Sequence, residues 1–214
     1  MDTTPYPKLV CGIAVGPSRM GNYNGTVGAI VTHNDTQRRM ILSNYHVLVA
    51  DNNAQPGDQI GQPASGQVVA RLSEIYFLTP FVDAALAVID IPDNASCEIH
   101  EIGHIAGVAQ GTIGTHVNKR GIGSGRTSGS IVATDQRAPA GYERISPEAW
   151  PLQGQFKIQA DSPGTAFSLA GDSGSCIVDD NLRVVGLLVG GSGNDSYATP
   201  IQTVIDNLGI TICP

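Results

Sequence analysis

The chain has 214 residues, of which 41% are hydrophobic and only 14% are charged, and its net charge is -7. Its 12 Lys and Arg residues are scattered, which argues against a nucleic-acid-binding surface, and no apolar run is long enough to cross a bilayer. The 26 glycines and 13 prolines are instead typical of many short strands separated by turns.

Short runs of β-forming residues are predicted as strands, and turn signals such as Asn24-Gly25 separate them. In chain order the runs cover residues 11–15, 26–33, 40–43, 68–72, 84–91, 115–119, 129–134, 156–159, 175–178 and 184–189. Only the last segment, 201–208, has a helical period. Its apolar residues recur at i, i+3, i+4 and i+7, as Ile201, Val204, Ile205 and Leu208. Successive strands with one closing helix predict an all-β barrel or sandwich.

Two segments interrupt this strand pattern. Glycine content rises in residues 103–114, which predicts a seam between two units of the chain. Residues 135–154 contain three prolines and are predicted as a long loop, and loops of that length are often functional.

The four cysteines lie far apart in the sequence, at Cys11, Cys97, Cys176 and Cys213. An even number allows two disulfides, but nothing in the spacing indicates a pairing. Residues 1–5 lack the basic and apolar regions of a signal peptide. We therefore expect a cytoplasmic protein with four free thiols, or a secreted one if a signal has been trimmed from the chain.

The strongest local signal is the segment Gly171-Asp172-Ser173-Gly174-Ser175, just before a predicted strand. A nucleophilic serine needs a sharp turn that projects its hydroxyl, and backbone N–H groups free to bind an oxyanion. Glycines on both sides of Ser173 permit that turn. The alternative is an ordinary polar turn between strands.

A serine is inert at neutral pH without a base, and the base needs a carboxylate to orient it. Among the five histidines, His46 stands out because it is expected to close a hydrophobic strand, where the rim of a barrel would present it. Asp83 opens an otherwise apolar strand, where a carboxylate is costly to bury without a hydrogen-bonding partner. We expect His46 to be that partner, and the alternative is a histidine with a purely structural role.

The order His46, Asp83, Ser173 on an all-β chain resembles the chymotrypsin-like (trypsin-like) serine peptidases. The segments S-N-Y-H-V, V-D-A-A-L-A and G-D-S-G resemble the three catalytic motifs of that superfamily. The segment G-R-T-S-G at 125–129 is similar to one in the streptogrisins and α-lytic protease. The residues of these motifs are most similar to those of the trypsin-like domain of plant narrow-leaf-type proteins and their bacterial relatives.

The resemblance implies two packed antiparallel six-stranded β-barrels, over about 10–103 and 112–200, followed by the helix at 201–208. It implies hydrolysis of peptide bonds in a protein or peptide substrate, with no cofactor or metal. The N–H groups of Gly171 and Ser173 would form the oxyanion hole. Because the chain has no Ile-Ile-Gly-type amino terminus to pair with Asp172, we expect Arg126, in the G-R-T-S-G segment, to do so. The alternative is an ordinary surface arginine on a glycine-rich loop. The substrate pocket implied by the resemblance is lined by Phe167, Ser168, Val189, Gly190, Gly191 and, from the following segment, Asp195.

Two other interpretations remain. The segment His100-Glu101-Ile102-Gly103-His104 matches the zinc-peptidase motif H-E-x-x-H, but its glycine disfavours the helix that this metal site needs. The rival to an active peptidase is a catalytically silent module of the same fold that binds peptides or acts as a scaffold.

Overall fold

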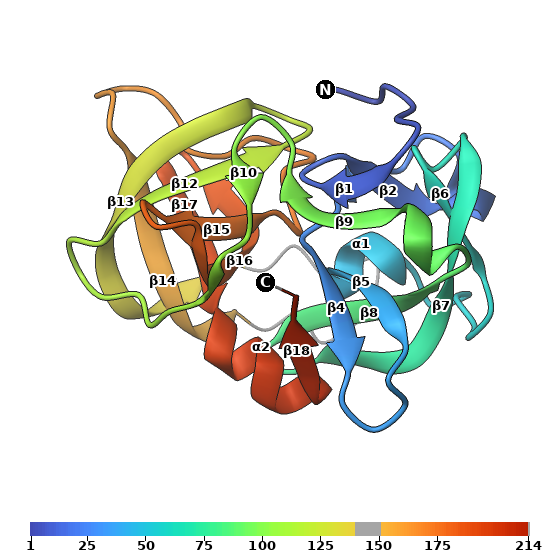
Figure 1. The fold of residues 1–214 in the computed structure, drawn as a ribbon. Helices are drawn as coiled ribbons and strands as arrows, with labels where there is room; N and C mark the ends of the chain where they lie inside the picture. The colour runs from blue at the N-terminus through green and yellow to red at the C-terminus, as the bar shows by residue number, and fades with distance from the viewer. Residues whose placement is uncertain (140–150, 214) are drawn as a thin grey trace.

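The computed structural model describes residues 1–139 and 151–213, which form two β-barrels packed side by side (Figure 1). The strands of the first barrel, coloured blue to green, come mainly from the N-terminal half of the chain, and those of the second come from the C-terminal half. The predicted seam at 103–114 lies where the chain passes from one barrel to the other.

The first barrel is built on an eight-stranded sheet in the order β18-β4-β5-β8-β7-β6-β2-β3. Its strands are β2 (Ala14–Pro17), β3 (Gly25–Thr26), β4 (Ala29–His33), β5 (Arg39–Ser43), β6 (Gln59–Gln62), β7 (Gln67–Leu78), β8 (Asp83–Ile89) and β18 (Ile210–Ile212). A separate three-stranded sheet joins β1 (Leu9–Cys11), β9 (Ala95–Ile99) and β10 (Gly103–His104). The C-terminal strand β18 therefore returns to the first barrel, where it pairs with β4.

The second barrel is a closed ring of six strands in the order β16-β15-β12-β13-β14-β17, because β17 also pairs with β16. A further strand, β11, pairs with the outer edge of β16. The bounds are β11 (Gly107–Val108), β12 (His116–Gly121), β13 (Gly125–Ala138), β14 (Leu152–Ala160), β15 (Cys176–Asp179), β16 (Arg183–Ser192) and β17 (Asp195–Pro200). Because the ring is closed, few strand edges remain unpaired.

Besides the strands, the described residues form two α-helices and two short 3-10 turns. The helices are α1 (Tyr45–Leu48) and α2 (Ile201–Leu208), and the 3-10 turns are η1 (Ser18–Met20) and η2 (Pro92–Asn94). Helix α2 has the predicted bounds: Ile201, Val204 and Leu208 are buried, and Gly209 ends it with a φ of +60°. None of the described helices has the length and apolar character needed to span a membrane.

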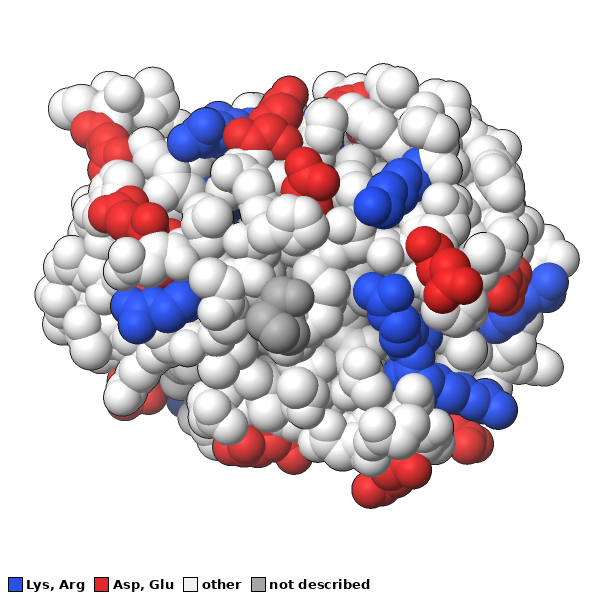
Figure 2. All heavy atoms as spheres, in the orientation of Figure 1, with Lys and Arg blue, Asp and Glu red and all other residues white. Residues whose placement is uncertain are grey.

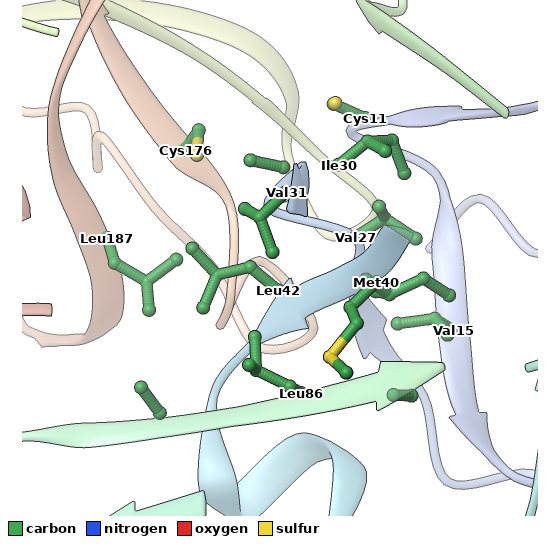
Figure 3. Close-up of a cluster of buried hydrophobic side chains, with 14 of the residues drawn as sticks. Cys11, Val15, Val27, Ile30, Val31, Met40, Leu42, Leu86, Cys176 and Leu187 are labelled. Atoms are coloured by element: carbon green, nitrogen blue, oxygen red, sulfur yellow. The ribbon is translucent and has the colours of Figure 1, made fainter. Parts of the chain in front are cut away.

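One hydrophobic core cluster crosses the boundary between the barrels. Figure 3 shows Leu42 and Leu86 of the first barrel beside Leu187 of the second, and all three are fully buried. Burying a leucine side chain contributes about 1.5–3 kcal/mol. The barrels are therefore joined by packed apolar side chains, and residues at their boundary have defined positions.

Two expectations about secondary structure need correction. Residues 135–154 are not one long loop, because β13 continues to Ala138 and β14 begins at Leu152; the middle, 140–150, lies outside the described residues. His46 does not close a strand but lies on the single-turn helix α1, just after β5.

The cysteines are also not four free thiols. Cys97 and Cys213 form a disulfide across 116 residues of sequence, because β18 carries Cys213 back to the first barrel. Cys11 and Cys176 are free and buried, and burial raises the pKa of the Cys11 thiol to about 12. Because disulfides persist in oxidising compartments, the cysteines no longer support the cytoplasmic expectation.

The zinc-peptidase motif does not lie on a helix. The chain turns sharply at Glu101, whose φ is +63°, and Gly103 and His104 form the short strand β10. On the face drawn in Figure 2, red Asp and Glu side chains lie beside the blue Lys and Arg side chains, including those of the blue run at the lower right.

Candidate active site

His46 and Asp83 meet at the boundary between the barrels. Asp83, the first residue of β8, is completely buried, and its carboxylate contacts the His46 ring at Nδ1. The other carboxylate oxygen accepts the main-chain N–H of His46 at 3.1 Å. The side-chain amide of Asn44, one residue before α1, donates to the Asp83 carbonyl at 2.8 Å. These bonds fix the orientation of the ring and leave Nε2 as its outer nitrogen.

Ser173 lies on the second barrel, directly across this boundary. A side chain at Gly25 would approach the Ser173 carbonyl oxygen to 3.1 Å and would collide with Val47, the neighbour of His46. The absence of a side chain at Gly25 therefore lets α1 and the serine loop, residues 171–174, come close together. The Ser173 hydroxyl donates to the Val189 carbonyl at 2.8 Å, and Val189 lines a pocket that His46 also lines.

The main chain around Ser173 is turned so that two N–H groups remain unbonded. Gly171 has a φ of +96°, which only glycine adopts readily. The Asp172 carbonyl accepts both the N–H of Ser175, at 3.0 Å, and its hydroxyl, at 2.6 Å, which directs the Ser173 N–H away from Ser175. Among the described residues, the N–H groups of Gly171 and Ser173 have no protein acceptor. Such a pair can bind a negatively charged oxygen.

The carboxylate of Asp172 is buried, and its cationic partner is Lys119 rather than Arg126. Lys119 Nζ lies 3.0 Å from the carboxylate, and both side chains are completely buried. Arg126 is exposed, and its guanidinium donates only a long 3.4 Å bond to the Glu101 carbonyl. The expectation for Arg126 was wrong because β12 pairs with β13 so that Lys119, not Arg126, points into the second barrel.

A set of hydrogen bonds completes the surroundings of this carboxylate. The N–H groups of Leu169, Gly123 and Ser124 and the Ser124 hydroxyl all donate to it, at 2.6–3.1 Å. Burial alone raises the pKa of a carboxyl, but the Lys119 charge and these donors outweigh it, and the pKa of Asp172 lies below its ordinary value. Burial lowers the pKa of Lys119, against the opposing effect of Asp172. The pair anchors the residue next to Ser173.

A small pocket lies beside His46. It has a volume of about 230 Å³ and is lined by His46, Ala138, Pro139, Val189, Gly190, Gly191 and Tyr197. The structure thus places three of the six expected pocket residues, Val189, Gly190 and Gly191, next to His46. A larger hollow of about 920 Å³ lies at β11, β14 and α2, and none of the candidate catalytic residues lines it.

The other expected pocket residues do not line this pocket. Phe167 is fully buried in the apolar core of the second barrel, where it packs with residues such as Ile131, so it cannot contact a substrate. Ser168 is buried and shares a 2.7 Å hydrogen bond with Ser196. Asp195 forms an ion pair of 2.6 Å with Lys157, which lowers its pKa.

The structure is similar to those of bacterial serine proteases. It matches protease A of Thermobifida fusca with a TM-score of 0.70 at 17% identity, over 95% of this chain and 97% of that one. It matches the chymotrypsin of Cellulomonas bogoriensis with a TM-score of 0.69 at 16% identity, over 96% and 98% of the two chains. An alpha-lytic protease homologue, N4, gives 0.68 at 21% identity, over 95% and 98%.

No protein-family model and no curated protein matches the sequence. The likeness therefore concerns the arrangement of the chain, and it covers nearly all of both partners in each comparison. Both the two packed β-barrels and the short closing helix agree with the expectation from the sequence. The chain has the chymotrypsin-like fold of two packed β-barrels, the fold of these bacterial serine proteases.

Proposed function

We propose that the protein is a serine endopeptidase that uses Ser173, His46 and Asp83. The observation that carries this proposal is the His46–Asp83 contact, which lies across the barrel boundary from Ser173. Within the described part of the chain, the N–H groups of Gly171 and Ser173 have no protein acceptor. A purely structural role for His46 does not explain the arrangement of the Gly171 and Ser173 N–H groups in the serine loop. The fold of the neighbouring proteases supports the same class of reaction.

In the proposed reaction, the Ser173 hydroxyl turns from the Val189 carbonyl to His46 Nε2 and attacks the carbonyl carbon of a peptide bond. His46 takes the serine proton as the new Oγ–C bond forms, and returns it to the leaving amine when the C–N bond breaks. Asp83 stabilises the imidazolium. The N–H groups of Gly171 and Ser173 bind the oxyanion, and losing one such donor costs about 3 kcal/mol of barrier. Water then hydrolyses the acyl-enzyme by the same steps.

For the substrate, we propose an apolar side chain next to the cleaved bond rather than Arg or Lys. Ala138, Val189 and Tyr197 give the pocket beside His46 an apolar wall. Asp195 would be the acid to attract a basic side chain, but Lys157 and Gln159 already bind its carboxylate. The pairing with Lys157 therefore weakens the alternative in which Asp195 selects basic residues.

The test combines a fluorophosphonate probe with a peptide library. The wild-type protein should be labelled at one site, and Ser173→Ala should remain unlabelled while its melting temperature stays within about 2 °C of wild type. The library should then show cleavage after apolar residues. A folded wild-type protein that is not labelled would favour the silent peptide-binding module, and strict cleavage after Arg or Lys would implicate Asp195.

A further inference from the structure

The serine loop makes main-chain hydrogen bonds to both barrels. From the second barrel, the Asp172 N–H donates to the Leu169 carbonyl at 3.0 Å, and the Gly174 N–H donates to the Leu188 carbonyl at 2.9 Å. The Asp172 carbonyl is held by Ser175. The carbonyls of Gly171 and Ser173 accept their hydrogen bonds from the other barrel.

Both of those donors belong to Thr26 in β3 of the first barrel. Its hydroxyl donates to the Gly171 carbonyl at 2.8 Å, and its N–H donates to the Ser173 carbonyl at 2.9 Å. Thr26 is completely buried. Among the described residues, no other first-barrel residue donates to the main chain of 171–174.

The same hydroxyl also accepts a hydrogen bond. The N–H of Ile122 donates to Thr26 Oγ1 at 3.2 Å, and the next two N–H groups, of Gly123 and Ser124, donate to the Asp172 carboxylate. One hydroxyl therefore joins β3, the turn between β12 and β13, and the serine loop. A valine has nearly the same shape as threonine but can make neither bond.

We propose that Thr26 is a positioning residue that sets the oxyanion hole from the first barrel. Its hydroxyl fixes the direction of the peptide unit between Gly171 and Asp172, and that unit lies between the two N–H groups that would bind the oxyanion. His46 and Asp83 are on the same barrel as Thr26, so this contact also holds the base and the oxyanion donors in register. The expected effect on the reaction rate rests on the proposed function. The hydrogen bonds of Thr26 to the serine loop do not depend on it.

The kinetic test uses p-nitrophenyl acetate, from which acylation of Ser173 releases nitrophenolate in a burst. Thr26→Val should lower the rate constant of acylation about tenfold and leave the affinity for p-nitrophenyl acetate unchanged. A small displacement of a catalytic group lowers the rate by this factor or more. Thr26→Ser, which keeps the hydroxyl, should stay within about twofold of wild type. The matched control is Thr199→Val, another fully buried threonine, whose hydroxyl donates to Gln155 at 2.8 Å in the second barrel.

A second measurement does not depend on activity. The measurement is the rate at which the Asp172 amide hydrogen exchanges with solvent, in proteins that also carry Ser173→Ala. This rate should rise about tenfold in Thr26→Val and stay unchanged in Thr199→Val. A wild-type protein without a burst would count against the proposed function, while the exchange measurement would still test the contact.

Thr26→Val with wild-type acylation and wild-type exchange would overturn the inference. If Thr26→Val does not fold, Thr26→Ala takes its place in both measurements. If neither folds while Thr26→Ser does, the hydroxyl serves folding rather than positioning, and the inference is equally overturned.

Discussion

His46 and Asp83, on the first barrel, meet through their side chains, whereas Ser173, on the second, is held through the main chain around it. Asp83 touches both the ring and the N–H of His46. The serine loop instead depends on a positive φ at Gly171, on carbonyls that are bonded from both barrels, and on a buried ion pair one residue away. Substitutions in the first region should therefore change chemistry, and those in the groups that support the serine loop should change chemistry and stability together.

The largest expected effect is on the first region. Asp83→Asn keeps the shape of the side chain but presents an amide to His46 Nδ1, which favours the wrong tautomer of the ring. The rate of Ser173 acylation should fall about 10⁴-fold, the scale seen when the aspartate of such a triad is lost. Labelling kinetics with the fluorophosphonate probe would measure this. A fall of less than tenfold in a folded variant would mean that Asp83 does not orient the base.

The second prediction concerns the buried pair behind the serine. Lys119→Met leaves the Asp172 carboxylate buried without its cation, and the free energy of unfolding should fall by about 3–5 kcal/mol at neutral pH. Because the pKa of Asp172 is lowered in the folded protein, the stabilisation by the pair is present above pH 3.8 and is lost as the pH falls through the folded pKa. The deficit of the variant should therefore shrink in acid.

Arg126→Ala is the control for that experiment. Arg126 is exposed, so its removal should change the free energy of unfolding by no more than about 0.5 kcal/mol and leave acylation unchanged. Urea unfolding of the wild type, Lys119→Met and Arg126→Ala at pH 7 and at pH 2.5 would measure both predictions. Equal losses in Lys119→Met and Arg126→Ala would contradict the assignment of Lys119.

The contrast between the two regions also explains what the sequence could predict. Short motifs indicated His46, Asp83 and Ser173, because each lies in a local pattern that the chemistry requires. The apolar period at 201–208 predicted α2 with its bounds. Lys119 was missed because its partner lies 53 residues away and because Arg126 stands in a segment that resembles one of the family. A lysine inside the predicted strand 115–119 was the available signal, since a strand that enters a core seldom carries an unpaired charge.

The remaining errors have the same origin in contacts between distant segments. The disulfide depends on β18 returning to the first barrel, which no spacing of the four cysteines could show. Phe167 was expected at the pocket because of its distance from the serine in sequence, but it packs into the core of the second barrel. Thr26 carried no motif, and its importance is visible only once both of its hydrogen bonds to the serine loop are seen.

The smallest expected effect lies on the second barrel, in an ionic cluster that contrasts with the buried Lys119–Asp172 pair. His116 Nδ1 lies 2.6 Å from Asp180 and Nε2 lies 3.0 Å from Asp161, but its side chain is 41% exposed. The hydrogen bonds to Asp180 and Asp161 raise the pKa of His116, and those from Ser128 and His116 lower the pKa of Asp161. Solvent screens such pairs, so the cluster should stabilise the fold by at most about 1 kcal/mol.

The pH dependence of this effect follows from the two directions. A raised histidine pKa gives stability that is complete below pH 6.5 and lost as the pH rises through the folded value. A lowered aspartate pKa gives stability that is present above pH 3.8 and lost as the pH falls through the folded value. The melting temperature of His116→Gln should therefore lie furthest below wild type between about pH 4 and 6.5 and should converge with it near pH 9. The acylation rate of His116→Gln should equal that of the wild type at every pH, because neither His116 nor its partners touch the serine loop. A deficit that persisted at pH 9 would show that His116 acts through packing rather than through its charge.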